Sequence, residues 1–195
     1  MAKMVSPVIL IIDMQNDFND PSTRLFCKRA NQIIPNINRL TRSARGRQVP
    51  VIWVVQEHRR QLVDYGREAD ISPLHCVEGT PGAAIIAELE REPGDFTVIK
   101  RRYSAFYATD LQLLLRCLGC NLVILTGIAT DGCVQATGLD AQARDYFVRV
   151  VTDATAGTGD DAHRAALVAL GRMQPGVILS TEDALDLLST KNLSE

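Results

Sequence analysis

Three residues that could carry out nucleophilic catalysis each follow an apolar run of the sequence. Asp13 follows "VILII", Lys100 ends "FTVIK", and Cys133 lies in "TGIATDGCV". A cysteine attacks a carbonyl carbon as the thiolate, so a base must accept its proton. No histidine lies near Cys133 along the chain. We therefore expect Asp13 to take the proton, while the Lys100 ammonium lowers the pKa of the thiol and orients the carboxylate.

Runs rich in Val and Ile predict the strands that would bring these residues together. Continuous apolar runs are typical of strands buried on both faces of a parallel sheet. Ligand sites in such sheets lie beyond the carboxyl ends of the strands, where all three residues would be. We predict strands over residues 6–14, 50–57, 95–100 and 121–128, and weaker ones over 147–154 and 176–181.

Helix-like stretches separate the predicted strands. Strands that alternate with helices predict an α/β fold with right-handed crossovers, here in a single domain over residues 1–195. The longest irregular region, 56–81, is polar and holds two of the three histidines, so we expect it to form a binding loop. The predicted helices span residues 31–47, 82–92, 109–119, 131–145 and 160–173.

The predicted helix 131–145 would carry Cys133 near its first turn. Unpaired backbone amides and the helix dipole at this end favour a thiolate. Gly132 precedes the cysteine and leaves room for a substrate beside the sulfur.

The overall composition favours a small-molecule partner in the cytoplasm. A formal net charge of -2 gives no basic excess for binding nucleic acid or a membrane surface. No apolar run approaches the roughly 20 residues that span a bilayer, and the N-terminus runs into a predicted strand without a cleavage site. The odd number of cysteines, five, leaves at least one thiol free and fits a reducing compartment.

Three segments of the sequence carry a resemblance to a known family. These are "VILIIDMQNDF", "VIKRRYSAFYATDL" and "LTGIATDGCVQATGLDA". In this order they resemble the isochorismatase-like cysteine hydrolases, which include nicotinamidases and the N-carbamoylsarcosine and ureidoacrylate amidohydrolases. The resemblance extends over nearly the whole chain and implies a Rossmann-like, three-layer α-β-α fold with a six-stranded parallel sheet. It also implies homodimers or homotetramers.

The resemblance assigns roles to particular residues. It implies a catalytic triad of Asp13, Lys100 and Cys133, and a cis peptide bond between Ile128 and Ala129. The backbone amides of Ala129 and Cys133 would form the oxyanion hole. The implied reaction cleaves a C–N bond of a small amide or ureide of the carbamoyl type through a thioester and releases ammonia. True isochorismatases lack the nucleophilic cysteine, so Cys133 argues against vinyl ether hydrolysis.

The metal site of the nicotinamidases is the main point of departure. In that branch a metal is bound by an Asp-x-His pair after the second strand and by a further histidine downstream. Here "QEHRR" offers Glu57 and Arg59 in the register of that pair, and only His75 matches the downstream ligand. Because a metal needs several ligands at once, we expect no metal and no cofactor.

Two alternatives to the ureide or amide hydrolase stay open. One is a nicotinamidase-type deamidase, and the other is a catalytically silent family member that acts as a binding or assembly subunit. Candidate substrate contacts follow the catalytic residues closely in the sequence, or follow the second strand: Asn16, Phe18, Glu57, Tyr103 and Phe106.

Overall fold

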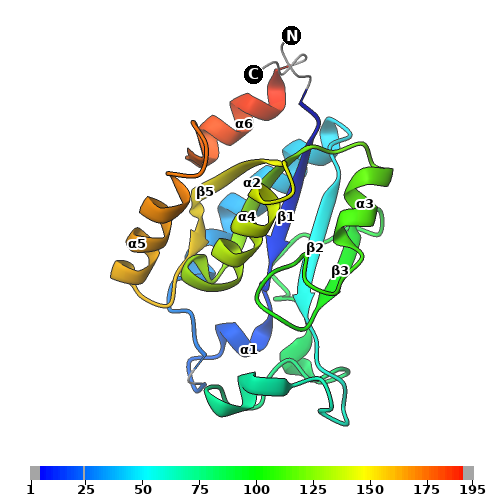
Figure 1. Cartoon of the computed structure of the whole chain (residues 1–195), viewed down its shortest axis with the longest axis vertical. Coiled ribbons are helices and arrows are strands. Elements are labelled where there is room, and N and C mark those ends of the chain that lie inside the picture. The colour runs from blue at the N-terminus through cyan, green and yellow to red at the C-terminus, as the bar shows by residue number, and fades with distance from the viewer. Residues whose placement is uncertain (1–4, 24, 191–195) are drawn as a thin grey trace.

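A six-stranded parallel sheet forms the centre of the protein, seen in a computed structural model that describes residues 5–23 and 25–190 (Figure 1). Positions 1–4, 24 and 191–195 of the expected domain lie outside the described residues. The strand order is β3-β2-β1-β4-β5-β6. Their bounds are β1 (Pro7–Ile12), β2 (Val51–Gln56), β3 (Phe96–Lys100), β4 (Leu122–Ile128), β5 (Phe147–Ala156) and β6 (Ile178–Leu179).

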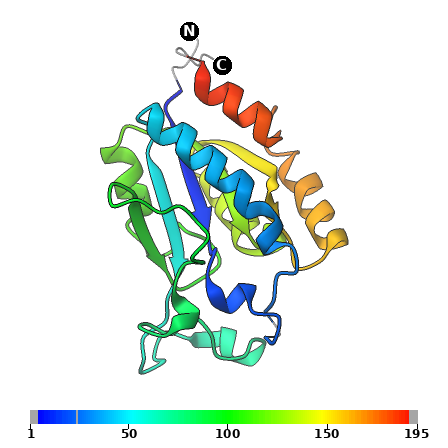
Figure 2. The same ribbon diagram turned by 180° about the vertical axis from the view of Figure 1, so that it is seen from behind.

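Helices cover both faces of this sheet, which confirms the three-layer α/β fold (Figures 1 and 2). They are α1 (Asn16–Asn19), α2 (Ala30–Gly46), α3 (Leu111–Cys117), α4 (Gln135–Gln142), α5 (Asp160–Leu170) and α6 (Thr181–Ser189). Among the residues described, no helix combines the length and the apolar character needed to cross a membrane.

The side chains of the central strands alternate between two hydrophobic cores. In β1, Ile9 and Ile11 point to the core beneath α2 and α6, while Val8, Leu10 and Ile12 point to the core beneath α3 and α4. Burial on both faces explains why these strands read as continuous apolar runs. Figure 2 shows α2 and α6 lying across the face opposite the one seen in Figure 1.

The predicted helix over 82–92 is wrong. The helical residues of this stretch are only the end of one 3₁₀ turn, Pro81–Ala83, and Ile85 forms an isolated β-bridge with Gln15. The backbone groups that a helix would pair internally bond elsewhere: Ile86 N donates to Met14 O at 3.0 Å, and Glu90 N donates to Asn38 Oδ1 at 3.0 Å. Tertiary hydrogen bonds to the end of β1 and to α2 thus replace the local helix.

Candidate active site

The three candidate catalytic residues meet at the carboxyl ends of their strands. Asp13 follows β1, Lys100 ends β3, and Cys133 lies in the turn after β4. Lys100 Nζ lies 2.7 Å from Asp13 Oδ2 and 3.3 Å from Cys133 Sγ. The exposed fractions are 1% for Asp13, 0% for Lys100 and 8% for Cys133. The fold therefore brings residues 120 positions apart in the sequence into one buried cluster.

A close approach of β1 and β4 sets the positions of Asp13 and the nucleophile turn. Ile12 and Gly127 are register partners in the sheet. Gly127 has a φ of +97°, and a Cβ added to it would lie 2.1 Å from Ile12 O. Only glycine fits this position. Directly after Ile12, Asp13 takes a left-handed conformation with φ of 52°, and the strand ends there.

Cys133 lies in a single π-helical turn, Thr130–Val134, that precedes α4. The predicted helix 131–145 therefore begins later than expected, because Gly132 adopts the non-helical φ and ψ of −129° and −106°. The peptide bond between Ile128 and Ala129 is cis, as the resemblance implied. Ala129 O accepts hydrogen bonds from Gly132 N at 3.0 Å and Val134 N at 3.1 Å, which closes the turn around the thiol.

The electrostatics of the cluster favour a protonated thiol in the free site. Burial raises the pKa of Cys133, the Asp13 carboxylate raises it further, and the Lys100 ammonium opposes both without reversing them. Burial also raises the pKa of Asp13, against the charge of Lys100. For Lys100, burial lowers the pKa, but Asp13 and Cys133 outweigh that effect and the net shift is upward. Lys100 thus lowers the pKa of the thiol as expected, but burial and the adjacent carboxylate outweigh it.

A cavity of about 220 Å³ adjoins the triad and takes in two of the candidate substrate contacts, Phe18 and Tyr103. The other three lie outside its lining. Asn16 Nδ2 donates to Pro81 O at 2.8 Å, and Phe106 packs against Tyr146 in the core. Glu57 N donates to Lys100 O at 3.0 Å, and its side chain does not line the cavity. The full lining is Asp13, Phe18, Leu25, Phe26, Cys27, Gln56, Glu68, Ser72, His75, Tyr103, Ile128, Ala129, Gly132, Cys133 and Thr158.

The irregular region 56–81 supplies polar walls of the cavity, and one of these residues, Glu68, was not assigned by the residue-by-residue reading of the sequence. Glu68, on the 3₁₀ turn Gly66–Asp70, and His75 both line the cavity. His75 Nε2 lies 3.2 Å from Glu68 Oε1. Burial opposes charge on both groups, yet their contact leaves the pKa of Glu68 below its ordinary value and that of His75 above it. The sequence signal was the region's length and polarity, which predicted a binding loop without naming Glu68.

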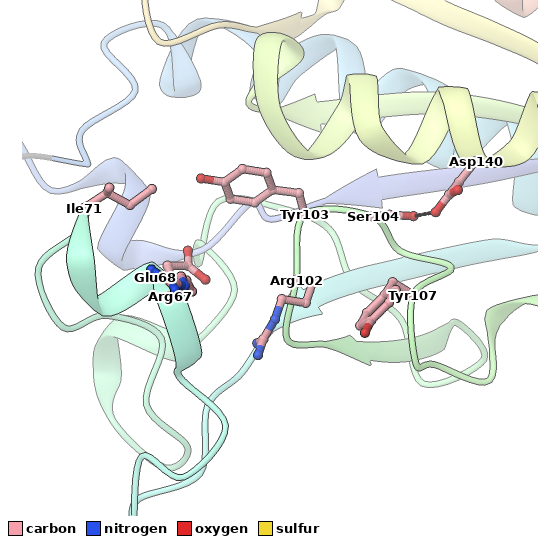
Figure 3. Close-up of a pocket in the computed structure, with 8 residues that line it drawn as sticks. All are labelled: Arg67, Glu68, Ile71, Arg102, Tyr103, Ser104, Tyr107 and Asp140. Carbon is pink, nitrogen blue, oxygen red and sulfur yellow. Dashed lines mark hydrogen bonds between the residues drawn. The ribbon is translucent and has the colours of Figure 1, made fainter.

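A second, outer cavity of about 530 Å³ lies next to the first (Figure 3). Glu68 and Tyr103 line both cavities. Figure 3 shows the turn that carries Glu68 facing the segment that carries Arg102, Tyr103 and Tyr107, with α4 and its Asp140 above them in the view. Tyr103, which is 47% exposed, thus lies between the buried site and the molecular surface.

Three side chains near the cavity have the donor atoms of a metal site. One ligand atom from each of His58, Glu68 and His75 lies within 4.8 Å of the other two. The register expected for the Asp-x-His pair is wrong by one residue, because Gln56 and His58 are buried and face this cluster, whereas Arg59 is exposed. The nitrogen of the Gln56 carboxamide lies 3.0 Å from His58 Nε2 and 3.1 Å from His75 Nε2. As the side chains stand, an N–H donor occupies the centre of the cluster, so the set does not fit a cation.

The fold is that of the isochorismatase-like hydrolases. The chain matches the isochorismatase domain over residues 7–183 and belongs to that family. A protein of Arabidopsis thaliana named as a probable inactive nicotinamidase is 36% identical over 171 residues, covering 82% of this chain and 85% of the relative. The ureidoacrylate amidohydrolase of Methylobacterium radiotolerans is 31% identical over 182 residues, covering 82% of this chain and 70% of the relative.

A solved structure supports the same assignment. The isochorismatase family protein from Desulfovibrio vulgaris superposes with a TM-score of 0.87 at 32% identity, covering 95% of this chain and all of the other. The family contains hydrolases that act on C–N bonds, as the name of the ureidoacrylate amidohydrolase states.

Proposed function

We propose that the protein is a cysteine-dependent amidohydrolase that cleaves a C–N bond of a small amide or ureide and releases ammonia. The position of Lys100 carries this proposal, since its ammonium contacts the Asp13 carboxylate and the Cys133 thiol together beside a cavity. A buried thiol, carboxylate and ammonium in one cluster are costly to keep without a chemical use. This cost speaks against the alternative of a catalytically silent subunit.

Acylation begins with transfer of the thiol proton to Asp13 as the sulfur attacks the substrate carbonyl. Because burial and Asp13 raise the pKa of the thiol, proton transfer and attack are proposed to be coupled rather than preceded by a stable thiolate. The Lys100 charge stabilises the anionic pair throughout. Backbone amides of Ala129 and Cys133 are proposed to hold the oxyanion. The tetrahedral intermediate then collapses, the C–N bond breaks, and Asp13 returns the proton to the leaving ammonia.

Deacylation repeats these proton movements with water. Asp13 takes a proton from the water, the hydroxide attacks the thioester, and the C–S bond breaks. The sulfur then recovers its proton from Asp13, so the site returns to its starting state. For a ureide the intermediate is the corresponding thiocarbamate, and the chemistry is otherwise the same.

The cavity favours a small substrate with hydrogen-bond donors. Sites for drug-sized ligands occupy about 300–1,000 Å³, and this cavity holds about 220 Å³. The Glu68 carboxylate in its wall is an acceptor that a ureide NH₂ group could meet. The ureidoacrylate amidohydrolase among the relatives acts on a ureide by name, which supports this substrate class.

The cellular setting follows from the same proposal. The five cysteines are free, and a reducing compartment such as the cytoplasm suits a catalytic thiol. We further propose a homodimer or homotetramer, since Leu113, Leu139 and Val168 on the outer helices are each more than half exposed. Light scattering after gel filtration gives the mass that tests this.

Ammonia release from a panel of ureidoacrylate, biuret, N-carbamoylsarcosine, maleamate and nicotinamide tests the reaction. We expect turnover of a ureide or small amide, and none by Cys133→Ala. Cys27→Ala is the matched control, because Cys27 lines the same cavity but its sulfur bonds to Gly157 O at 3.2 Å. Equal turnover by native protein and Cys133→Ala would refute the mechanism. Turnover of nicotinamide alone would favour the nicotinamidase alternative.

A further inference from the structure

The cluster of His58, Glu68 and His75 lies outside the triad and has the donor atoms of a metal site. His58 and His75 are buried, at 0% and 4% exposed, and Glu68 turns its carboxylate toward both. Two imidazoles and a carboxylate are ligands that zinc and other divalent metals take. A cation bound to them would lie about 2.0–2.2 Å from each ligand atom, near the centre of the group.

The Gln56 carboxamide already occupies that centre. Its Nε2 lies 3.0 Å from His58 Nε2 and 3.1 Å from His75 Nε2. The same nitrogen lies 3.0 and 3.1 Å from the two Glu68 carboxylate oxygens. An amide nitrogen carries two N–H donors and no acceptor, so it can donate to two of these four atoms at a time but cannot ligate a metal.

The active-site lysine fixes the direction of this amide. Lys100 Nζ donates to Gln56 Oε1 at 3.3 Å. Turning the amide over would present an NH₂ group to the ammonium, which leaves two donors facing each other in a buried site. The backbone of Gln56 is held as well, because its N–H donates to Gln15 Oε1 and its carbonyl accepts from Gln15 Nε2, both at 2.8 Å.

Glu68 and His75 have further partners without a cation, whereas His58 Nδ1 is buried and has no hydrogen-bond partner among the described residues. Glu68 is paired with His75 at 3.2 Å. The other ring nitrogen of His75, Nδ1, lies 2.8 Å from Pro73 O and 2.7 Å from the Tyr65 hydroxyl. Hydrogen bonds therefore orient Glu68 and His75 without a metal, and within the described part of the chain the His58 ring is held through Nε2 alone.

We propose that the Gln56 carboxamide takes the place of a divalent cation in this cluster and excludes one from it. Hydrogen bonds to the Gln56 side chain then hold Glu68 and His75, in the loop that forms the cavity wall, against the end of β2. The inference concerns binding of a cation and does not depend on the reaction proposed above.

Zinc binding to the full-length protein tests this inference. Protein stripped with a chelator is equilibrated with Zn²⁺, passed through gel filtration and assayed for zinc by mass spectrometry. Because free thiols also bind zinc, each protein is compared with its own His75→Ala counterpart, and only the difference is counted. For the wild type we expect a difference close to zero. For Gln56→Asp, which replaces the donor with a shorter ligating carboxylate, we expect about one zinc ion per chain.

Two further measurements keep the result decisive. Gln56→Ala empties the centre without adding a ligand, and it should also gain zinc, more weakly than Gln56→Asp. In the wild type alone, the NMR signals of the Gln56 side-chain NH₂ should not move as Zn²⁺ is added. A wild-type chain that takes up zinc through His75, with those signals shifted, would overturn the inference. So would folded Gln56→Asp and Gln56→Ala proteins that take up no more zinc than the wild type.

Discussion

Replacing Lys100 with methionine tests the electrostatic design of the site most directly. The substitution keeps much of the side-chain volume and removes the ammonium that lies 2.7 Å from Asp13 Oδ2. With an effective dielectric constant of about 20, a pair at this distance interacts by about 6 kcal/mol. Part of that gain offsets the cost of burying the ammonium, so we expect the free energy of unfolding to fall by about 3–5 kcal/mol near pH 8.

The loss should depend on pH, with a sign fixed by Asp13. Burial already raises the pKa of this carboxyl above 3.8, and the Lys100 charge holds that rise back. Without the charge the pKa of Asp13 rises further, and the carboxyl becomes protonated in the folded state. A group whose pKa is raised on folding contributes stability at low pH and loses it as the pH rises through the folded-state pKa. The deficit of Lys100→Met should therefore be larger at pH 8 than at pH 5.

Urea unfolding at the two pH values measures this difference. Arg39→Met is the matched control, since Arg39 Nη2 also lies 2.7 Å from its partner Glu182, but with side chains 43% and 71% exposed. That change should cost less than about 1 kcal/mol at either pH. Hydrolysis by Lys100→Met should fall by at least about 10²-fold, because a protonated Asp13 cannot accept the thiol proton. Equal costs for the two variants, or a deficit that does not change with pH, would refute the reasoning.

Three other substitutions give independent checks. Asp13→Asn should lose about 10²–10⁴-fold in hydrolysis. Iodoacetamide should nevertheless alkylate Cys133 of this variant faster near pH 8, because the carboxylate that raises the thiol pKa is gone. Slower alkylation would contradict this expectation. Gly127→Ala should destabilise the fold by more than about 3 kcal/mol in urea unfolding, since the added Cβ would collide with β1. The control is Gly46→Ala, whose Cβ would lie in open space, and it should change stability by less than about 1 kcal/mol. Tyr103→Ala should raise KM about tenfold with little change in kcat, as expected for a residue that shapes the cavity entrance; a fall in kcat alone would argue against that role.

The strands were predictable from the sequence because their burial is nearly complete. β1 and β4 are buried almost throughout, and this gives continuous apolar runs that local reading can find. The helix predicted over 82–92 was wrong for the opposite reason, since the hydrogen-bond partners of its backbone lie just after β1 and on α2, far away in the sequence. α6 was missed although it carries a local signal, a capping box between Ser180 and Asp183.

Some residues of the candidate site could likewise be found from the sequence, and others could not. Strand ends pointed to Asp13, Lys100 and Cys133, because parallel strands deliver their carboxyl ends to one edge of the sheet. The role of position 56 required the phase of the chain as it leaves β2, and an error of one residue exchanges inward and outward side chains. Glu68 lies in an irregular loop whose course no periodicity describes, so its approach to His75 could be found only in the folded structure.

The surroundings of Lys100 have a consequence for what this residue can do in the reaction. An ammonium group has three N–H donors, and Lys100 Nζ has three acceptors within reach: Asp13, Cys133 and Gln56. Because these three groups surround Nζ, we expect Lys100 not to bind the substrate of the proposed reaction directly. Its three hydrogens are also shut away from bulk water, and rotation about the terminal C–N bond would break all three contacts together. Slow hydrogen exchange should therefore make this ammonium visible in a nitrogen NMR spectrum at neutral pH, a condition in which exposed lysines exchange too fast to be seen.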